Sequence, residues 1–163
     1  MKVRELMTTD LITVSPQADL AWADDVMGIA EVRHLPVVDE ERLVGLVTRR
    51  DLLRASLSVL ADLEVDQVNA MMHAVKISAI MRRGVQTIDP DADVRDAIAT
   101  MIDQKYGCVP VVEGNRLVGI ITESDFLCLA RELVSERDKP WLKRSLPTAD
   151  DEEPMVDVLG DRR

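Results

Sequence analysis

Residues 35–51 read LPVVDEERLVGLVTRRD, and residues 109–125 read VPVVEGNRLVGIITESD, so one stretch occurs twice. The two copies align without a gap from Met7 against Met81 to Asp51 against Asp125, at a constant shift of 74 residues. Sixteen of these 45 pairs are identical, against about three expected by chance for ordinary composition. A period of 74 is too long for a solenoid repeat, so the sequence predicts a small domain duplicated in tandem.

The composition limits both the core and the class of partner. In a chain of 163 residues, two units of about 60 residues would each be marginally stable alone, so we expect the copies to pack against each other. Aromatic residues make up only 2%, which predicts an aliphatic core. The net charge of −10 argues against binding to nucleic acid, although a local pocket can still be basic.

The sequence shows no signal for export or membrane insertion. The first ten residues, MKVRELMTTD, lack the apolar segment of a signal peptide, and no apolar run reaches about 18 residues. Cys108 and Cys128 form neither a disulfide framework nor a zinc signature, and they fit a reducing compartment. Met71, Met72 and His73 do not converge on one centre from a helix. We therefore expect a cytoplasmic protein without membrane contact, bound metal or required cofactor.

Each copy is predicted to contain a strand, a helix, two strands and a second helix, which makes an α/β (α+β) unit. The first repeat is placed at residues 1–60, a partly helical linker at 61–76, the second repeat at 77–134, and an acidic flexible tail at 135–163. Within the repeats, lead-in turns are expected at 3–7 and 77–81, and short first strands at 11–14 and 85–88.

The first helix of each copy is marked by an aspartate at its start, Asp19 or Asp93, suited to capping. Apolar residues then recur at helical spacing, which predicts a buried stripe. The stripe consists of Leu20, Ala23, Met27 and Ala30 in the first copy, and of Val94, Ala97, Ile98, Met101 and Ile102 in the second.

Two apolar runs split by a short polar turn follow in each copy, at 35–38 and 43–48 and again at 109–112 and 117–122. They predict two hairpins, with Pro36 and Pro110 at a strand start or a sheet edge. Second helices are expected at 49–60 and 123–133.

The linker and the tail differ in apolar content. The linker contains several apolar residues, which indicate that it packs against the repeats and is not a free linker. These residues are Leu60, Leu63, Val68 and Met72. From about Arg137 onward the pattern is lost, apart from apolar islands that are either docking points or incidental contacts. These islands are Trp141-Leu142 and Met155–Leu159.

A Thr-x-x-Asp motif stands at each strand-to-helix junction, as Thr48 with Asp51 and as Thr122 with Asp125. It is first of all a capping box, in which the side chains of the threonine and the aspartate each accept a hydrogen bond from the backbone of the other residue. The same geometry also suits a ligand, because a helix N-terminus attracts phosphate and a carboxylate can accept two hydrogen bonds from a ribose diol. Gly45 and Gly119 within the strands indicate the close approach of another backbone or of a ligand.

The duplicated hPVV…RLVGhhTxxD pattern resembles a pair of CBS (cystathionine-β-synthase) domains, the tandem known as a Bateman module, over about residues 1–133. The resemblance implies two repeats packed with pseudo-twofold symmetry, and clefts that bind AMP, ADP, ATP or S-adenosylmethionine. It also implies that the aspartate holds the ribose hydroxyls, the threonine lies by the phosphates or the ribose, and apolar groups sandwich the adenine.

Carried over to this sequence, the resemblance implies two ligand sites. The first consists of His34, Leu46, Thr48, Arg50 and Asp51, with Gln86 and Tyr106 from the second copy. The second consists of Ile120, Thr122, Ser124 and Asp125, with Ile12, Val32 and Arg33 from the first copy.

The two sites differ in charge. Arg50 and His34 of the first can offset phosphate charge, and Arg49 either joins them or points to solvent. The second has Ser124 and Cys108 at the matching positions, and Glu123 in place of Arg49. The first site is therefore expected to bind a phosphorylated ligand, and the second a less charged ligand or none.

Three functions are weighed. The leading one is a regulatory module that senses adenosine derivatives (energy sensing), forms a homodimer and signals to an effector protein that the sequence does not identify. The alternative is a ligand-free dimerisation or scaffold module, in which Thr-x-x-Asp only caps helices. An enzyme is not expected, because the chain contains no P-loop, no metal-ligand set and no nucleophile–base pair.

Overall fold

The computed structural model describes residues 1–60 and 65–134 of the chain. Residues Met1–Phe126 form one unit, which contains both hairpins, and a second unit starts at Leu127. The elements in chain order are η1 (Val3–Glu5), α1 (Leu20–Ile29), β1 (His34–Asp39), β2 (Arg42–Thr48), α2 (Arg49–Leu60), α3 (Val65–Ala74), α4 (Ile77–Ile80), α5 (Val94–Gln104), β3 (Cys108–Glu113), β4 (Arg116–Thr122) and α6 (Glu123–Leu133).

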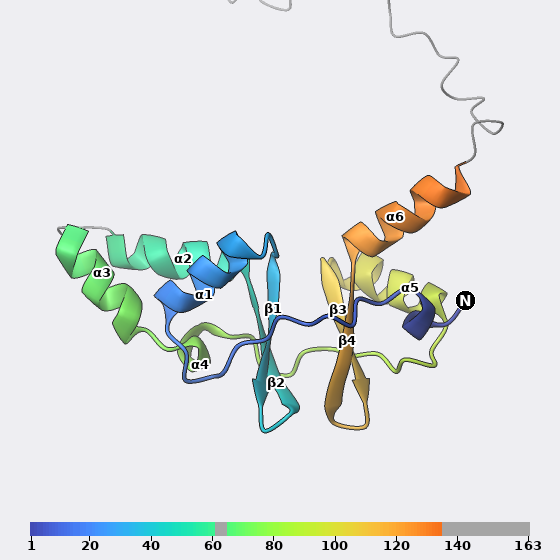
Figure 1. Cartoon of the computed structure of the whole chain (residues 1–163), viewed down its shortest axis with the longest axis horizontal. Coiled ribbons are helices and arrows are strands. Elements are labelled where there is room, and N and C mark those ends of the chain that lie inside the picture. Colours follow the sequence, from blue (N-terminus) through green and yellow to red (C-terminus); the bar gives the residue numbers. More distant parts are fainter. Residues whose placement is uncertain (61–64, 135–163) are drawn as a thin grey trace, which may run out of the picture. The chain divides into compact units, whose positions relative to one another are not determined.

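The predicted hairpins are confirmed, and together they make one antiparallel sheet (Figure 1). Its strand order is β1-β2-β4-β3, which reads the same from both ends when the repeats are exchanged. The two hairpins meet at Arg42 and Arg116, which are equivalent positions of the two copies. The expected mixed α+β fold is therefore present, with the pseudo-twofold relation carried by the sheet.

The turns of the two hairpins both contain residues with positive φ angles, but the residue types differ. A two-residue turn that matches the strand twist needs positive φ angles, which cost little only for glycine or asparagine. The second hairpin uses Gly114, at φ +63°, whereas the first places Glu40 and Glu41 at φ +45° and +67°. The first turn is therefore the more strained of the two.

The short strands expected at 11–14 and 85–88 are not formed, and this prediction is wrong in extent. Val14 makes one parallel bridge to Val37, and Ile88 makes one to Val111. The ladder cannot lengthen, because a proline without an N–H lies beside the bridge in each edge strand, at Pro36 and at its equivalent Pro110. Both prolines lie in edge strands, as predicted.

The first helices begin where the sequence predicts. Asp19 accepts a hydrogen bond from the Trp22 amide at 2.9 Å, and Asp93 accepts one from the Arg95 amide at 2.9 Å. The stripe prediction fails at Ile102, whose side chain is 69% exposed. Each residue turns the helix by about 100°, so Ile102 lies well around the axis from the buried Met101.

The lead-in segments are exchanged between the copies. Val3 of η1 is fully buried in the core of the second copy, beside Val94 and Ala97, and Figure 1 shows η1 next to α5. Ile77 of α4 is fully buried in the core of the first copy. Neither copy therefore completes its core from its own residues alone.

Two glycines allow this exchange. A Cβ added at Gly45 would lie 2.8 Å from the Met81 sulfur and 2.9 Å from the Arg82 carbonyl oxygen. A Cβ added at Gly119 would lie 3.2 Å from the Thr8 carbonyl oxygen. The close approach predicted at both glycines is thus made by the backbone of the other copy's lead-in.

Within the predicted linker at 61–76, residues Val65–Ala74 form α3, which contacts α1 and α2, and Met72 lies against the first core. Leu63, the Leu60 side chain and the tail at 135–163, with Trp141-Leu142 and Met155–Leu159, lie outside the described residues. Within 1–60 and 65–134, no helix combines the length and the apolar character needed to cross a membrane.

The exchange predicts that a lead-in residue stabilises the opposite copy. Ile77→Ala leaves a cavity in the first core and should lower the free energy of unfolding by about 3 kcal/mol. In hydrogen exchange, protection should fall in β1 and β2. Leu133→Ala is the matched control and should change stability by less than about 0.5 kcal/mol, because its side chain is 71% exposed. Equal losses in the two variants would contradict the exchange.

Candidate functional site

The first Thr-x-x-Asp motif forms the capping box at the junction of β2 and α2. The Thr48 amide and hydroxyl both donate to Asp51 Oδ2, at 3.0 Å and 2.6 Å. The Asp51 amide in turn donates to the Thr48 hydroxyl at 3.3 Å. The junction is tied to the preceding loop by the Arg49 amide, which donates to the Arg33 carbonyl oxygen at 2.9 Å.

The second motif repeats this arrangement at the junction of β4 and α6. The Thr122 amide and hydroxyl donate to Asp125 Oδ2 at 2.7 Å and 2.8 Å. The Glu123 amide donates to the Gly107 carbonyl oxygen at 3.2 Å, as Arg49 does to Arg33 in the first copy. The two halves therefore share a backbone and differ in their side chains.

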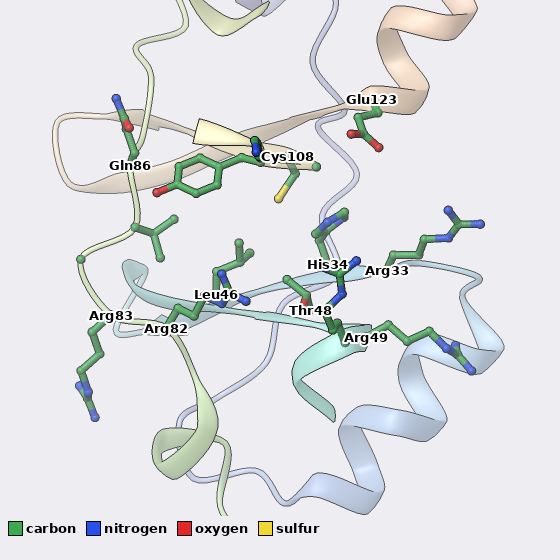
Figure 2. Close-up of a pocket in the computed structure, with 16 residues that line it drawn as sticks. Arg33, His34, Leu46, Thr48, Arg49, Arg82, Arg83, Gln86, Cys108 and Glu123 are labelled. Carbon is green, nitrogen blue, oxygen red and sulfur yellow. The ribbon is translucent and has the colours of Figure 1, made fainter. Parts of the chain in front are cut away.

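A cavity of about 420 Å³ opens beside the first motif, with walls from both copies (Figure 2). Leu46, Thr48 and Arg49 lie on one side of it, and Cys108 and Glu123 lie on the other. The full lining consists of Arg33, His34, Leu46, Thr48, Arg49, Arg50, Arg82, Arg83, Gly84, Val85, Gln86, Lys105, Tyr106, Gly107, Cys108 and Glu123.

The lining is strongly basic in an acidic chain. Six of its residues are arginine or lysine, and only Glu123 is acidic, whereas the whole chain carries a net charge of −10. A concave surface lined by one sign of charge concentrates ligands of the opposite sign. The cavity is therefore suited to an anion.

Asp51 is covered by an arginine from the second copy. Arg82 donates to Asp51 Oδ1 from Nη2 at 3.1 Å and from Nε at 3.4 Å. The Asp51 side chain is 11% exposed, whereas that of Arg82 is 52% exposed. Burial raises the pKa of Asp51, but hydrogen bonds from Thr48 and Arg82 outweigh it and hold the pKa below its usual value.

His34 lies between an acidic and a basic neighbour. Burial is the main effect and lowers the pKa of His34 below its usual value; the Glu123 charge acts in the opposite direction, and the Arg33 charge lowers the pKa further. Its imidazole is packed so closely on Gly107 that an added Cβ there would lie 3.1 Å from Nε2. Glycine at 107 therefore leaves room for the histidine.

Cys108 lines the same cavity as His34, although the two occupy equivalent positions of different copies. Burial and the nearby Glu123 charge raise the pKa of the Cys108 thiol to about 12. The thiol is therefore protonated at neutral pH and lacks the thiolate form that nucleophilic catalysis needs.

The structure places six of the seven residues assigned to the first site around this cavity: His34, Leu46, Thr48, Arg50, Gln86 and Tyr106. Asp51, the seventh, lies behind Arg82 and is not part of the lining. Arg33, assigned to the second site, lines this first cavity instead.

The other residues assigned to the second site are Ile12, Val32, Ile120, Thr122, Ser124 and Asp125, and none of them lines this cavity. Ile120 is paired through its backbone with Thr8, in both directions, at 2.9 Å and 3.0 Å. The Thr8 hydroxyl donates to Asp125 Oδ1 at 3.3 Å. Thr8 thus contacts Asp125 from the position that corresponds to that of Arg82 beside Asp51.

Sequence reasoning missed several basic residues of the cavity, namely Arg82, Arg83 and Lys105. Arg82 and Arg83 follow the exchanged lead-in that ends at Met81, and nothing in the local pattern shows that this segment crosses to the first copy. The repeat alignment contains a signal for them, because the shift of 74 residues aligns Arg82 and Arg83 with the uncharged Thr8 and Thr9.

Comparison with known proteins identifies the family to which the fold belongs. The CBS domain family model matches residues 3–58 and 77–132. The chain therefore belongs to the CBS domain family and contains a pair of these domains.

Among curated relatives, protein MJ1225 of Methanocaldococcus jannaschii is 32% identical over 162 residues, which is 90% of this chain and 54% of that protein. The inosine-5'-monophosphate dehydrogenase of the same organism is 32% identical over 85% of this chain and 25% of its own length. A CBS domain-containing protein of Dictyostelium discoideum is 31% identical over 78% of this chain and 89% of its own length. The chain thus spans about half or less of the first two relatives.

Two solved structures are similar over most of the chain. Protein AcuB from Vibrio cholerae has 33% identity and a TM-score of 0.70, covering 82% of this chain and 92% of that chain. The CBS domain pair of protein MJ0100, solved with 5'-methylthioadenosine and S-adenosyl-L-methionine, has 27% identity and a TM-score of 0.69, covering 82% and 98%.

The opposed charges around His34 predict opposite effects of two substitutions. Glu123→Gln removes a negative charge and should lower the pKa of His34, whereas Arg33→Gln removes a positive charge and should raise it. Titration of the imidazole Cε1–H signal by NMR measures both. Shifts of the same sign in the two variants would contradict the geometry of the cavity.

Proposed function

We propose that this chain is a regulatory module that binds an adenosine derivative in the basic cavity beside Thr48 and Asp51. The observation that carries the proposal is the concentration of six cationic side chains around a cavity next to the N-terminus of α2. Support comes from the similar CBS pair of MJ0100, whose structure contains two adenosine compounds. AMP, ADP, ATP and S-adenosylmethionine are the candidate ligands.

The lining divides into parts that suit the parts of such a ligand. Phosphate would lie at the start of α2, beside Arg50 and His34. Ribose hydroxyls would donate to Asp51. The adenine would lie between Leu46 and Tyr106, with Gln86 near its polar edge.

The second site is proposed for a less charged ligand or none. It would use Ile12, Val32, Ile120, Thr122, Ser124 and Asp125, with Arg33, which is the equivalent of Gly107 in the second copy. Equivalent positions exchange Arg49 for Glu123 and Lys105 for Glu31, so the charge that favours phosphate in the first site is reversed.

Regulation would follow from the two-sided cavity. A ligand that contacts residues of both repeats favours one arrangement of the repeats and shifts the population toward it. We propose that this shift is transmitted to an effector protein in the cytoplasm as an energy signal, and that the chain acts by binding rather than by catalysis.

The alternative is a ligand-free scaffold, and one observation favours it. In both Thr-x-x-Asp motifs the threonine amide and hydroxyl donate to the aspartate, as in a helix cap. In this case the two aspartates would have the same role, which makes them a matched pair for a test.

Asp51→Ala and Asp125→Ala separate the two functions. Each removes a cap and should lower stability by about 1 kcal/mol. Only Asp51→Ala should also weaken binding of AMP, by tenfold or more, because it alone removes the acceptor for the ribose. Calorimetric titration with AMP, ADP, ATP, S-adenosylmethionine and NAD measures this.

Two outcomes would count against the sensor. If the folded, nucleotide-free wild type bound none of these five compounds, an adenosine ligand would be excluded. Equal binding of AMP to the wild type and to Asp51→Ala would leave Asp51 with a capping role only.

A homodimer is also proposed, since large apolar side chains are exposed on helices of both repeats. Trp22 is 46%, Ile29 86%, Leu53 54% and Ile102 69% exposed. Ile29→Arg and Ile102→Arg should shift the sedimentation coefficient from that of a dimer to that of a monomer. The exposed Glu31→Arg, next to α1, is the control for added positive charge. A monomeric wild type at tens of micromolar would contradict the proposal.

A further inference from the structure

The two oxygens of Asp51 have separate partners. Oδ2 accepts both hydrogen bonds from Thr48 and so belongs to the cap of α2. Oδ1 accepts only from Arg82 among the hydrogen bonds in the described part of the chain. Oδ1 is therefore the atom that a ligand can take over without breaking the cap, and Arg82 already occupies it.

We propose that Arg82 determines the specificity of the cavity by admitting anionic ribosides and excluding neutral ones. This rests on the proposed function, in which Asp51 accepts hydrogen bonds from the ribose. Asp51 is only 11% exposed and does not line the cavity, whereas Arg82 lines it and covers Oδ1, so a ribose diol can reach Oδ1 only if the guanidinium moves aside. The ligand and Arg82 thus compete for one carboxylate oxygen.

The exchange has an unequal cost for neutral and anionic ligands. Removing Arg82 breaks a charge-assisted hydrogen bond to a carboxylate that is only 11% exposed. A neutral diol replaces the hydrogen bonds but not the opposite charge. A ligand with a phosphate offers the released guanidinium a new anionic partner within the same cavity, which Arg82 also lines.

The backbone allows the side chain of Arg82 to move alone. The Arg82 amide and carbonyl oxygen are both bonded to Leu46, at 2.9 Å and 3.0 Å, and the preceding Met81 is packed in the first core. The Arg82 side chain itself is half exposed. A rotation of the side chain is therefore enough to uncover Oδ1.

At the second motif, the position that corresponds to Arg82 is occupied by an uncharged residue. Thr8, the equivalent of Arg82, donates from its hydroxyl to Asp125 Oδ1 at 3.3 Å. A neutral hydroxyl is replaced by a diol without loss of an ion pair. The selection against neutral ribosides is therefore confined to the first copy.

Arg82→Met tests the inference in the full chain, by calorimetric titration with AMP and with adenosine. In the wild type AMP should bind more tightly than adenosine. In Arg82→Met the affinity for adenosine should rise about tenfold, because Oδ1 is uncovered, and that for AMP should fall, because the cation is lost. Arg82→Lys should lie between the wild type and Arg82→Met for both compounds.

Arg83→Met is the matched control. Arg83 lines the same cavity, but its Nη2 bonds to the Ser78 carbonyl oxygen at 3.4 Å rather than to Asp51. This variant should bind AMP somewhat more weakly and adenosine unchanged.

The outcomes separate this inference from the proposed function. Adenosine affinity that is unchanged or reduced in Arg82→Met, with AMP still bound by the wild type, overturns the role of Arg82 and leaves the proposed function standing. Absence of binding of AMP, ADP, ATP, S-adenosylmethionine, NAD and adenosine to the wild type and to all three variants overturns the proposed function, and this inference with it.

Discussion

The structure depends on the reciprocal burial of the two lead-in segments. Val3 completes the core of the second copy, and Ile77 completes that of the first. Each segment passes so close to the opposite hairpin that only glycine fits, at Gly45 and Gly119. Each core contains an element of the other repeat, so the two marginally stable repeats are stabilised as one unit. The same exchange places the segment that follows Met81 at the cavity of the first copy.

The exchange also explains how a symmetric backbone produces an asymmetric site. Both copies present a capped helix start, a nearby lead-in and a loop before the third strand. The side chains that differ are those which solvent or a ligand would contact, such as Arg82 against Thr8 and Arg49 against Glu123. Duplication supplied the geometry twice, and substitution at cavity positions concentrated positive charge in one half.

Much of the fold could be predicted from sequence because its signals are local. Alternating apolar runs around short turns identify both hairpins, and α2 and α6 begin at the residue after each motif threonine. The exchange could not be predicted, because the apolar spacing of Val3 or Ile77 shows that a residue is buried but not which core buries it. For the same reason the sequence placed six residues of the first cavity but missed Arg82, whose partner Asp51 is in the other copy.

Capping and ligand binding are two explanations of the motif formed by Thr48 and Asp51, and the geometry makes them compatible. The cap uses Oδ2, whereas Oδ1 faces Arg82. A residue that is fixed by the cap presents its second oxygen in a constant position, which lowers the entropy lost when that oxygen binds a partner. The strength of the cap therefore supports recognition at the cavity instead of arguing against it.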